Sequence, residues 1–299
     1  MNMPTTTGID ATTAAQPADL PGTAFGCPRD FLENRFVYVV VSPRARGLSV
    51  GVNLNPDKFC NFDCAYCEVN RAEPARESKL EVGVMIAELE RTLVLAQSGR
   101  LRERPCYQNL PEELLKLRHV TLSGDGEPTL SPNFVETVEA VIHLRARGRV
   151  PFFKLVLITN ASGLDRPEVE QGLRFFTAAD EVWAKLEAGT QDFMDRANKP
   201  DCTLEKIVAN ILRLARQRPV TVQSLFPSIA GQGPAPSEVE AYAQRLKELK
   251  EAGAQIPLVQ IYSATRPTPH SECGHLPLRT LSAIAQRVRE VAGLKAEVF

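Results

Sequence analysis

The chain has 299 residues, of which 43% are hydrophobic and 24% are charged, as in an ordinary globular protein with a substantial core. Its 35 basic and 36 acidic residues leave a formal net charge of −1 at pH 7, so no overall field attracts nucleic acid or an anionic membrane. The charge therefore does not indicate nucleic acid as a partner. No apolar run reaches the roughly 18 residues of a membrane span, and no membrane partner is expected.

Two local groups of basic residues are interpreted as solvated helix ends rather than as a phosphate-binding patch. They are Arg145, Arg147 and Arg149, and Arg213, Arg216 and Arg218.

The first 30 residues are rich in Thr, Ala and Pro and lack the basic start and apolar stretch of a secretory signal. This composition predicts a disordered tail over 1–30, followed by one folded domain over 31–299. A chain without an export signal is expected in the cytoplasm, where thiols stay reduced. Clustered cysteines in that setting indicate metal binding or catalysis more often than disulfides.

Apolar patterns along the chain predict strands that alternate with helices. In order, these are strands at 35–41 and 48–54, a helix at 80–98, a strand at 118–124, a helix at 132–147, a strand at 152–160, a helix at 167–177, a strand at 181–189, a helix at 203–217, a strand at 220–226, a helix at 237–252, a strand at 257–263 and a helix at 278–291. Counted from 48–54, six strands alternate with helices, which predicts an α/β fold with parallel strands in a barrel or an open sheet. In either arrangement ligands bind at the carboxyl ends of the strands.

Three of the seven cysteines stand within eight positions, at Cys60, Cys64 and Cys67, directly after the strand at 48–54. Zinc sites and ferredoxin-type clusters use four protein ligands, whereas the spacing C-x3-C-x2-C supplies three. Three thiolates suit a cubane cluster that keeps one iron open for an outside ligand. The alternatives are a zinc knuckle with a distant fourth ligand, or free structural thiols.

The cysteine spacing, with Tyr66 just before the last cysteine, resembles the signature of the radical S-adenosylmethionine (radical SAM) superfamily. The resemblance implies a partial (βα)6 barrel and one [4Fe-4S] cluster on Cys60, Cys64 and Cys67. It also implies reductive cleavage of SAM to a 5′-deoxyadenosyl radical, which takes a hydrogen atom from the substrate. An electron donor such as flavodoxin or ferredoxin would then be a partner.

Further segments resemble the SAM-binding motifs of this superfamily. In "SGDGEPTL" (123–130), Gly124 and Gly126 are expected to let the backbone approach SAM closely, and Asp125 stands where many members have glycine. "ITN", "AKLEAGT" and "VQIYS" end later strands, and the last is expected near the adenine. The resemblance thus implies these SAM-binding residues: Gly124, Asp125, Gly126, Glu127, Asn160, Lys185, Glu187, Ile261 and Tyr262.

Within the superfamily, "KLEAGT" and "ATRPTP" are similar to the group that contains the tRNA wyosine-synthesis enzymes. Those enzymes carry a second cluster on upstream cysteines, whereas Cys27 is this chain's one upstream cysteine. The similarity therefore supports the fold and the cofactor chemistry more than it supports wyosine formation. A tRNA-modifying synthase of this kind, and a non-enzymatic module that holds zinc or a structural cluster, are the alternative functions.

The substrate is expected to contact the loop after the strand at 257–263, at Arg266, His270 and Cys273. Arg266 offers a planar guanidinium to a carboxylate or phosphate. His270, Cys273 and His275 have a spacing that could bind a metal, but a surface loop between prolines is the favoured interpretation. The sequence does not identify the substrate.

Overall fold

The computed structural model describes residues 31–266 and 268–299. The predicted disordered tail at 1–30, with Cys27, lies outside the described residues.

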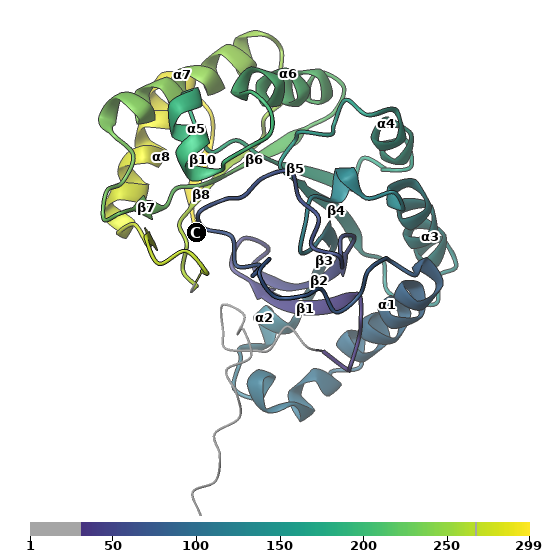
Figure 1. The fold of residues 1–299 in the computed structure, drawn as a ribbon. Coiled ribbons are helices and arrows are strands. Elements are labelled where there is room, and N and C mark those ends of the chain that lie inside the picture. The colour runs from purple at the N-terminus through teal and green to yellow at the C-terminus, as the bar shows by residue number, and fades with distance from the viewer. Residues whose placement is uncertain (1–30, 267) are drawn as a thin grey trace, which may run out of the picture.

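Eight strands form one sheet in the order β1-β2-β3-β4-β5-β6-β8-β10, which curls into a partial barrel (Figure 1). Its strands are β1 (Val37–Ser42), β2 (Gly47–Asn53), β3 (Leu117–Ser123), β4 (Lys154–Thr159), β5 (Glu181–Lys185), β6 (Val220–Leu225), β8 (Val259–Tyr262) and β10 (Ala296–Val298). Neighbours from β2 to β10 pair in parallel, and β1 pairs antiparallel with β2. The predicted α/β partial barrel is confirmed.

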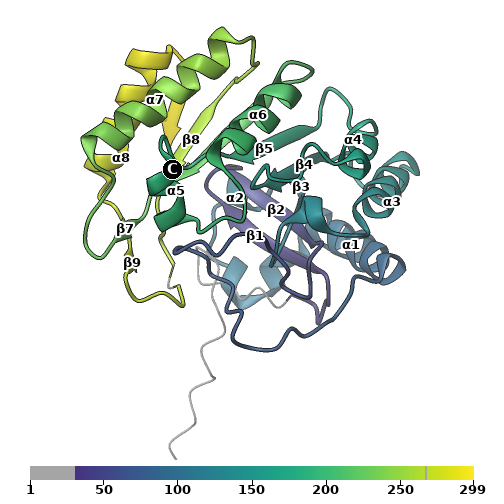
Figure 2. The same cartoon turned by 45° about the horizontal axis from the view of Figure 1, so that its top comes forward.

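Helices cover the outer face of this sheet. These helices are α1 (Val82–Gln97), α3 (Phe134–Ala146), α4 (Pro167–Leu173), α6 (Leu204–Ala215), α7 (Pro236–Glu251) and α8 (Leu278–Ala292). Helix α5 (Gln191–Ala197) instead lies beside the cysteine loop, to which its last residue is hydrogen-bonded. Short elements are α2 (Glu112–Leu115), the 3-10 helices at Arg100–Glu103, Pro105–Tyr107 and Pro128–Leu130, and the paired strands β7 (Ser228–Ile229) and β9 (Cys273–Gly274), seen at one edge in Figure 2. No helix of the described residues is both long and apolar enough to cross a membrane.

The two faces of the sheet differ in polarity. On β2, Val50 and Val52 are fully buried on the face that packs against the helices, while Ser49 and Asn53 belong to the opposite face because strand side chains alternate. On β3, His119 and Thr121 continue this polar inner face. A polar barrel interior is not needed for packing, so it points to a binding site inside the barrel.

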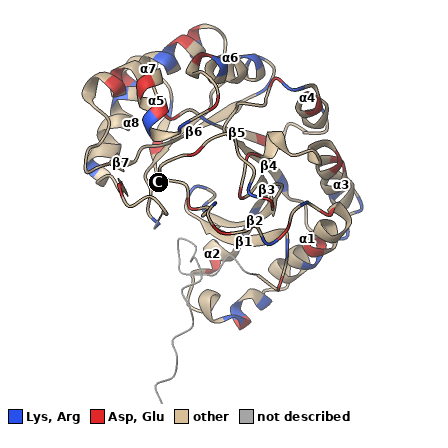
Figure 3. Cartoon of the chain, viewed as in Figure 1, with Lys and Arg blue, Asp and Glu red and all other residues tan. Residues whose placement is uncertain are grey.

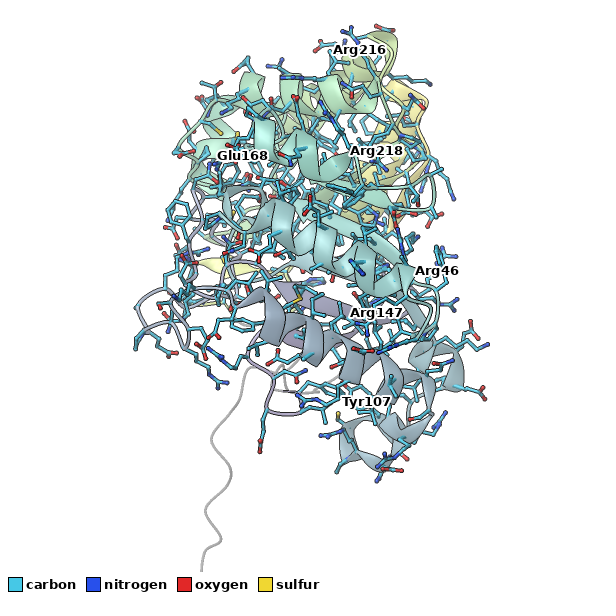
Figure 4. All side chains as sticks on the ribbon, turned by 90° about the vertical axis from the view of Figure 1, so that its right-hand side faces the viewer. Arg46, Tyr107, Arg147, Glu168, Arg216 and Arg218 are labelled. Atoms are coloured by element: carbon cyan, nitrogen blue, oxygen red, sulfur yellow. The ribbon has the colours of Figure 1, made fainter. Side chains whose placement is uncertain are left out.

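Figure 3 shows acidic and basic residues interspersed over the outer helices, without a face of one sign. The basic groups predicted to be solvated helix ends behave in two ways. Arg216 is exposed at the end of α6 and donates to the carbonyl oxygen of Ala252, as predicted (Figure 4). Arg218, two residues further on, is partly buried: it donates to the carbonyl oxygen of Leu173, and its Nε atom is buried without an acceptor among the described residues. Arg145 differs: its guanidinium is buried and donates to both carboxylate oxygens of Asp180, at 2.6 and 2.9 Å. Removing one partner of such a pair leaves a buried charge, which costs about 3–5 kcal/mol.

Strand β10 and helix α5 are among the elements that were not predicted. Strand β10 adds a parallel edge beyond β8, although its three residues are too few for a periodic pattern. Helix α5 follows β5 closely, and its first turn is capped by Thr190, whose hydroxyl accepts from the backbone N–H of Phe193 at 3.3 Å. This helix provides the backbone on which the cysteine loop rests.

Candidate active site at the carboxyl ends of the strands

A cavity of about 320 Å³ opens inside the barrel, bounded by the loops that follow β2, β3, β4, β5 and β8. It brings together most of the residues predicted from the sequence. Those that line it are Cys60, Cys64, Cys67, Gly124, Asp125, Gly126, Glu127, Asn160, Lys185, Tyr262 and Arg266. The carboxyl ends of parallel strands meet at one edge of the sheet, so segments more than 200 residues apart converge here.

The cysteine loop is held in place by backbone and side-chain hydrogen bonds to the segment after β5. Ala65 donates its N–H to the carbonyl oxygen of Ala197 at 2.9 Å, and the Asn61 side chain donates to Asp201 at 2.6 Å. The Lys58 ammonium group folds the loop on itself by donating to the carbonyl oxygen of Asn70 at 2.7 Å. These contacts hold the segment that carries the three cysteines.

Burial favours the protonated thiol at two of the three cysteines. Burial raises the pKa of Cys64 to about 12, against the opposing positive charge of Lys185, and burial also raises the pKa of Cys60. Arg71 donates to the Cys67 sulfur at 3.3 Å. A coordinating metal centre deprotonates such thiols. In the described part of the chain, no three His, Cys, Asp or Glu residues converge closely enough to hold a single metal ion.

The two motif glycines lie against other protein loops. Gly124 has φ +138°, and a β-carbon there would lie 2.1 Å from the side-chain oxygen of Asn53. A β-carbon at Gly126 would lie 1.8 Å from the carbonyl oxygen of Phe59, next to Cys60. The sequence motif predicts that both glycines allow SAM to approach the backbone closely. The structure gives a second reason for glycine at these positions, because a side chain there would prevent this loop from packing against β2 and the cysteine loop.

Glu127 joins the glycine motif to the end of β4. Its buried carboxylate accepts from the Thr159 hydroxyl at 2.5 Å, from the Asn160 backbone N–H at 2.7 Å and from the Thr129 hydroxyl at 2.6 Å. Burial raises the pKa of this carboxyl, and the donors oppose that shift. With its carboxylate occupied in this way, Glu127 positions Asn160 beside the cavity.

Lys185 and Glu187, at the end of β5, have separate positions. Lys185 lines the cavity, with its ammonium group 5.3 Å from the centre of the Tyr66 ring. Burial lowers the pKa of Lys185, but Glu187, Tyr262 and the nearby cysteines together outweigh this effect, so the net shift is upward. Glu187 lies beneath the cysteine loop, where it accepts from the Tyr66 hydroxyl and, at 2.6 Å, from the Asn198 amide. It supports the loop rather than lining the main cavity.

Four predicted residues need separate placement. Ile261 is fully buried, because it faces the opposite side of β8 from the cavity-lining Tyr262. Arg266 lines the cavity and pairs with Glu68 at 2.6 Å. His270 and Cys273 do not line the cavity; the backbone of Cys273 pairs with Ile229 in the small β7–β9 sheet.

Several cavity residues escaped the sequence-based prediction. Tyr38 and Ser123 share a hydroxyl hydrogen bond of 2.8 Å. Behind the cavity wall, Asn53 donates to the cavity-lining Asp125 at 2.7 Å. Others lie deeper in the barrel: Arg44, His119, Trp183 and Gln223. Polar residues stand at alternate positions of β3, at His119, Thr121 and Ser123. This alternation indicates a polar inner face, but the strands were interpreted as apolar runs.

Comparisons with known proteins agree with this geometry. The sequence pattern of the radical SAM superfamily matches residues 54–229. A UPF0026 protein of Helicobacter pylori is 30% identical over 185 residues, which are 60% of this chain and 52% of that relative. The chain thus spans about half the length of that relative.

Among solved structures, Streptococcus suis SuiB bound to S-adenosylmethionine superposes on 82% of this chain and 49% of its own, with a TM-score of 0.56 and 14% identity. TYW1 with a lysine–pyruvate adduct superposes on 87% of this chain and 85% of its own, with a TM-score of 0.54 and 14% identity. At these identities the likeness establishes the fold. The match to the superfamily covers more than half of the sequence. The chain therefore belongs to the radical SAM superfamily, whose members use a [4Fe-4S] cluster and S-adenosylmethionine.

Proposed function

We propose that this protein is a radical SAM enzyme that holds its [4Fe-4S] cluster through Cys60, Cys64 and Cys67 and acts on a substrate inside the barrel. The observation that carries the proposal is the single cavity lined by all three cysteines and by the ends of β3, β4, β5 and β8. Membership of the superfamily supports the assignment as an enzyme, and the residue assignments are inferred from this cavity.

The residues present fit both cofactors. Three thiols on one preformed loop match a cluster with three protein ligands and an open iron. Beside them, the cavity offers backbone at Gly124 and Gly126, the amide of Asn160, the ammonium of Lys185 and the ring of Tyr262. These groups suit the amino acid, ribose and adenine parts of SAM, while Glu127 and Glu187 keep the loops in position. When bound, the cofactors supply the reductive cleavage of SAM to a 5′-deoxyadenosyl radical.

The protein's own task is to orient and shield this chemistry. Arg266 of the loop after β8 reaches Glu68 of the cysteine loop at 2.6 Å, so two loops meet over the cavity. We expect this contact to limit access of water and oxygen to the cysteines. A one-electron donor such as flavodoxin or ferredoxin would serve as the redox partner, and the substrate is not identified by these residues.

The test is anaerobic reconstitution with iron and sulfide, followed by dithionite and SAM. We expect a brown protein that forms 5′-deoxyadenosine, and loss of cluster and product in Cys64→Ala. Cys106→Ala is the matched control, because Cys106 lies in the separate 3-10 helix at Pro105–Tyr107 and should leave both unchanged. A colourless protein that binds zinc and does not cleave SAM would overturn the proposal and favour a non-enzymatic metal-binding module.

A further inference from the structure

The cavity extends past the proposed cofactor site into the inner half of the barrel. His119 pairs in register with Ser49 near the amino ends of β3 and β2, whereas Ser123 pairs with Asn53 at their carboxyl ends. Both His119 and Ser49 still line the cavity. The inner half is therefore continuous with the space beside the cysteines, and the proposed function leaves it unassigned.

Arg44, in the turn between β1 and β2, is a cavity-lining cation with an unusual environment. Its guanidinium lies 4.1 Å from the centre of the Tyr262 ring, and its Nε atom is buried without a hydrogen-bond acceptor among the described residues. Leaving a buried donor unsatisfied costs about 1–3 kcal/mol, and more for a charged group. Within the described residues, no carboxylate forms an ion pair with Arg44.

The other basic residues of the cavity do have acceptors or negative charges as partners. Arg266 pairs with Glu68 at 2.6 Å, and Arg71 donates to the sulfur of Cys67. Lys185 lies in the field of Glu187. Arg44 therefore stands apart, because among the described residues its guanidinium meets the Tyr262 ring but neither a hydrogen-bond acceptor nor a carboxylate.

His119 adds a neutral hydrogen-bonding group to the same region. It is 2% exposed, and burial together with the positive charges of Lys154 and Arg44 lowers its pKa to about 3. Neutral imidazole carries one donor and one acceptor, and neither ring nitrogen bonds a described residue. The edge of His119 meets the Trp183 ring at a centroid distance of 5.2 Å.

Acidic side chains near this region are already engaged. The carboxylate of Glu181 accepts from the Lys154 ammonium at 2.6 Å and from the Trp183 indole N–H at 2.7 Å. Glu181 thereby neutralises Lys154 and leaves the positive charge of Arg44 uncompensated. A cation, a neutral imidazole and aromatic walls form a surface that favours an anionic group.

We propose that the inner half of the cavity binds a carboxylate or phosphate group of a small-molecule substrate, with Arg44 as its cationic anchor and Trp183 and Tyr262 as its walls. This inference rests on the proposed function, because it places the substrate beside the cofactors. It assigns the anion to Arg44 rather than to Arg266, whose guanidinium already bonds Glu68.

Trp183 supplies a direct probe, because it is the chain's one tryptophan. Protein labelled with 5-fluorotryptophan should give a single ¹⁹F resonance from the wall of the proposed site. The reconstituted, oxidised enzyme with SAM is titrated with inorganic phosphate and, separately, with acetate, at ionic strength held constant with chloride. Glycerol is the neutral control. We expect a saturable change in the ¹⁹F chemical shift with at least one of the two anions and no change with glycerol. A response to phosphate indicates a phosphate group on the substrate, and a response to acetate indicates a carboxylate.

Arg44→Met keeps the length of the side chain and removes its charge, so it should raise the Kd for the responding anion at least tenfold. Arg44→Lys should bind more weakly than the parent but more tightly than Arg44→Met. Arg46→Met is the matched control, since Arg46 lies in the same turn but pairs with Glu297; its Kd should stay within twofold of the parent. If Arg44→Met does not fold, Arg44→Gln provides the same comparison.

The proposal is overturned if neither anion gives a saturable shift, or if the uncharged Arg44 variants bind as tightly as the parent. It is also overturned if Arg266→Met abolishes the response while Arg44→Met retains it. Formation of 5′-deoxyadenosine by the parent is measured in the same samples. An Arg44-dependent ¹⁹F shift without SAM cleavage would support the anion site and reject the proposed function. SAM cleavage without a ¹⁹F shift would support the proposed function and reject the anion site.

Discussion

Gly126 lies so close to the carbonyl oxygen of Phe59 that a β-carbon at position 126 would be 1.8 Å from it. The N–H of Glu127 donates to the same oxygen at 3.1 Å. Phe59 immediately precedes Cys60, so the glycine motif and the cysteine loop are packed as one unit. A change at the glycine should therefore reach the cysteines.

We expect Gly126→Ala to lose iron and SAM affinity together, because the added carbon must displace the backbone beside Cys60. Overpacking of this kind costs about 1–3 kcal/mol of folding stability. Iron content after reconstitution and SAM binding by calorimetry measure the two effects. Gly83→Ala is the control, since a β-carbon at Gly83 meets nothing within 4 Å. Full iron content with weakened SAM binding in Gly126→Ala would show that the glycine serves SAM alone.

The protein should carry a single cluster. Outside the motif, Cys106, Cys202 and Cys273 lie on separate segments of the described chain, and Cys27 lies outside it. We expect about four irons per chain, from cubane stoichiometry, in both the parent and a variant with Ala at these four cysteines. Iron and sulfide analysis after anaerobic reconstitution is the measurement. About eight irons in the parent and four in the variant would restore the wyosine-type reaction as the leading alternative.

Tyr66 and Glu187 should be energetically coupled. The Tyr66 hydroxyl donates to the buried Glu187 carboxylate, and hydrogen bonds to charged groups contribute about 1.5–3 kcal/mol. A double-mutant cycle of Tyr66→Phe and Glu187→Gln, read by urea unfolding, should give a coupling of about 2 kcal/mol.

For comparison, Glu187→Gln combined with Tyr107→Phe should be additive within about 0.5 kcal/mol, because Tyr107 packs against Phe31 in another part of the structure (Figure 4). Additivity in the Tyr66 cycle would mean that Glu187 does not support the cysteine loop.

Stability should fall in mild acid because of His119. Its pKa falls from 6.5 to about 3 in the folded protein, through burial and the charges of Lys154 and Arg44. Between these values the unfolded chain binds a proton that the folded chain does not, so the free energy of unfolding decreases as the pH drops. From pH 7.5 to pH 5.5 this amounts to about 1.4 kcal/mol, an effect that His119→Gln should remove.

Urea unfolding of both proteins at the two pH values measures the difference. His143→Gln is the control, because His143 is exposed on α3, and it should keep the pH dependence of the parent. An unchanged pH dependence in His119→Gln would contradict the buried, neutral state of His119.

The spacing of Cys60, Cys64 and Cys67 and the alternation of strands with helices were sufficient to predict the superfamily and the partial barrel. Both are local properties: ligands on one loop, and periodic burial along single elements. Asn160, Lys185 and the glycine motif stand at or just after the ends of predicted strands. Because the carboxyl ends of parallel strands meet at one edge of the sheet, the sequence also predicted that these residues lie together.

Tertiary structure decided what each of these residues touches. Gly126 packs on Phe59, and the Glu127 carboxylate accepts a hydrogen bond from Thr159. Both contacts join loops that are far apart in the chain, so no local pattern encodes them. The same holds for Arg44, which a sequence presents as one arginine of a turn. Only closure of the barrel brings it over Tyr262, more than 200 residues away, and leaves its charge without a partner among the described residues.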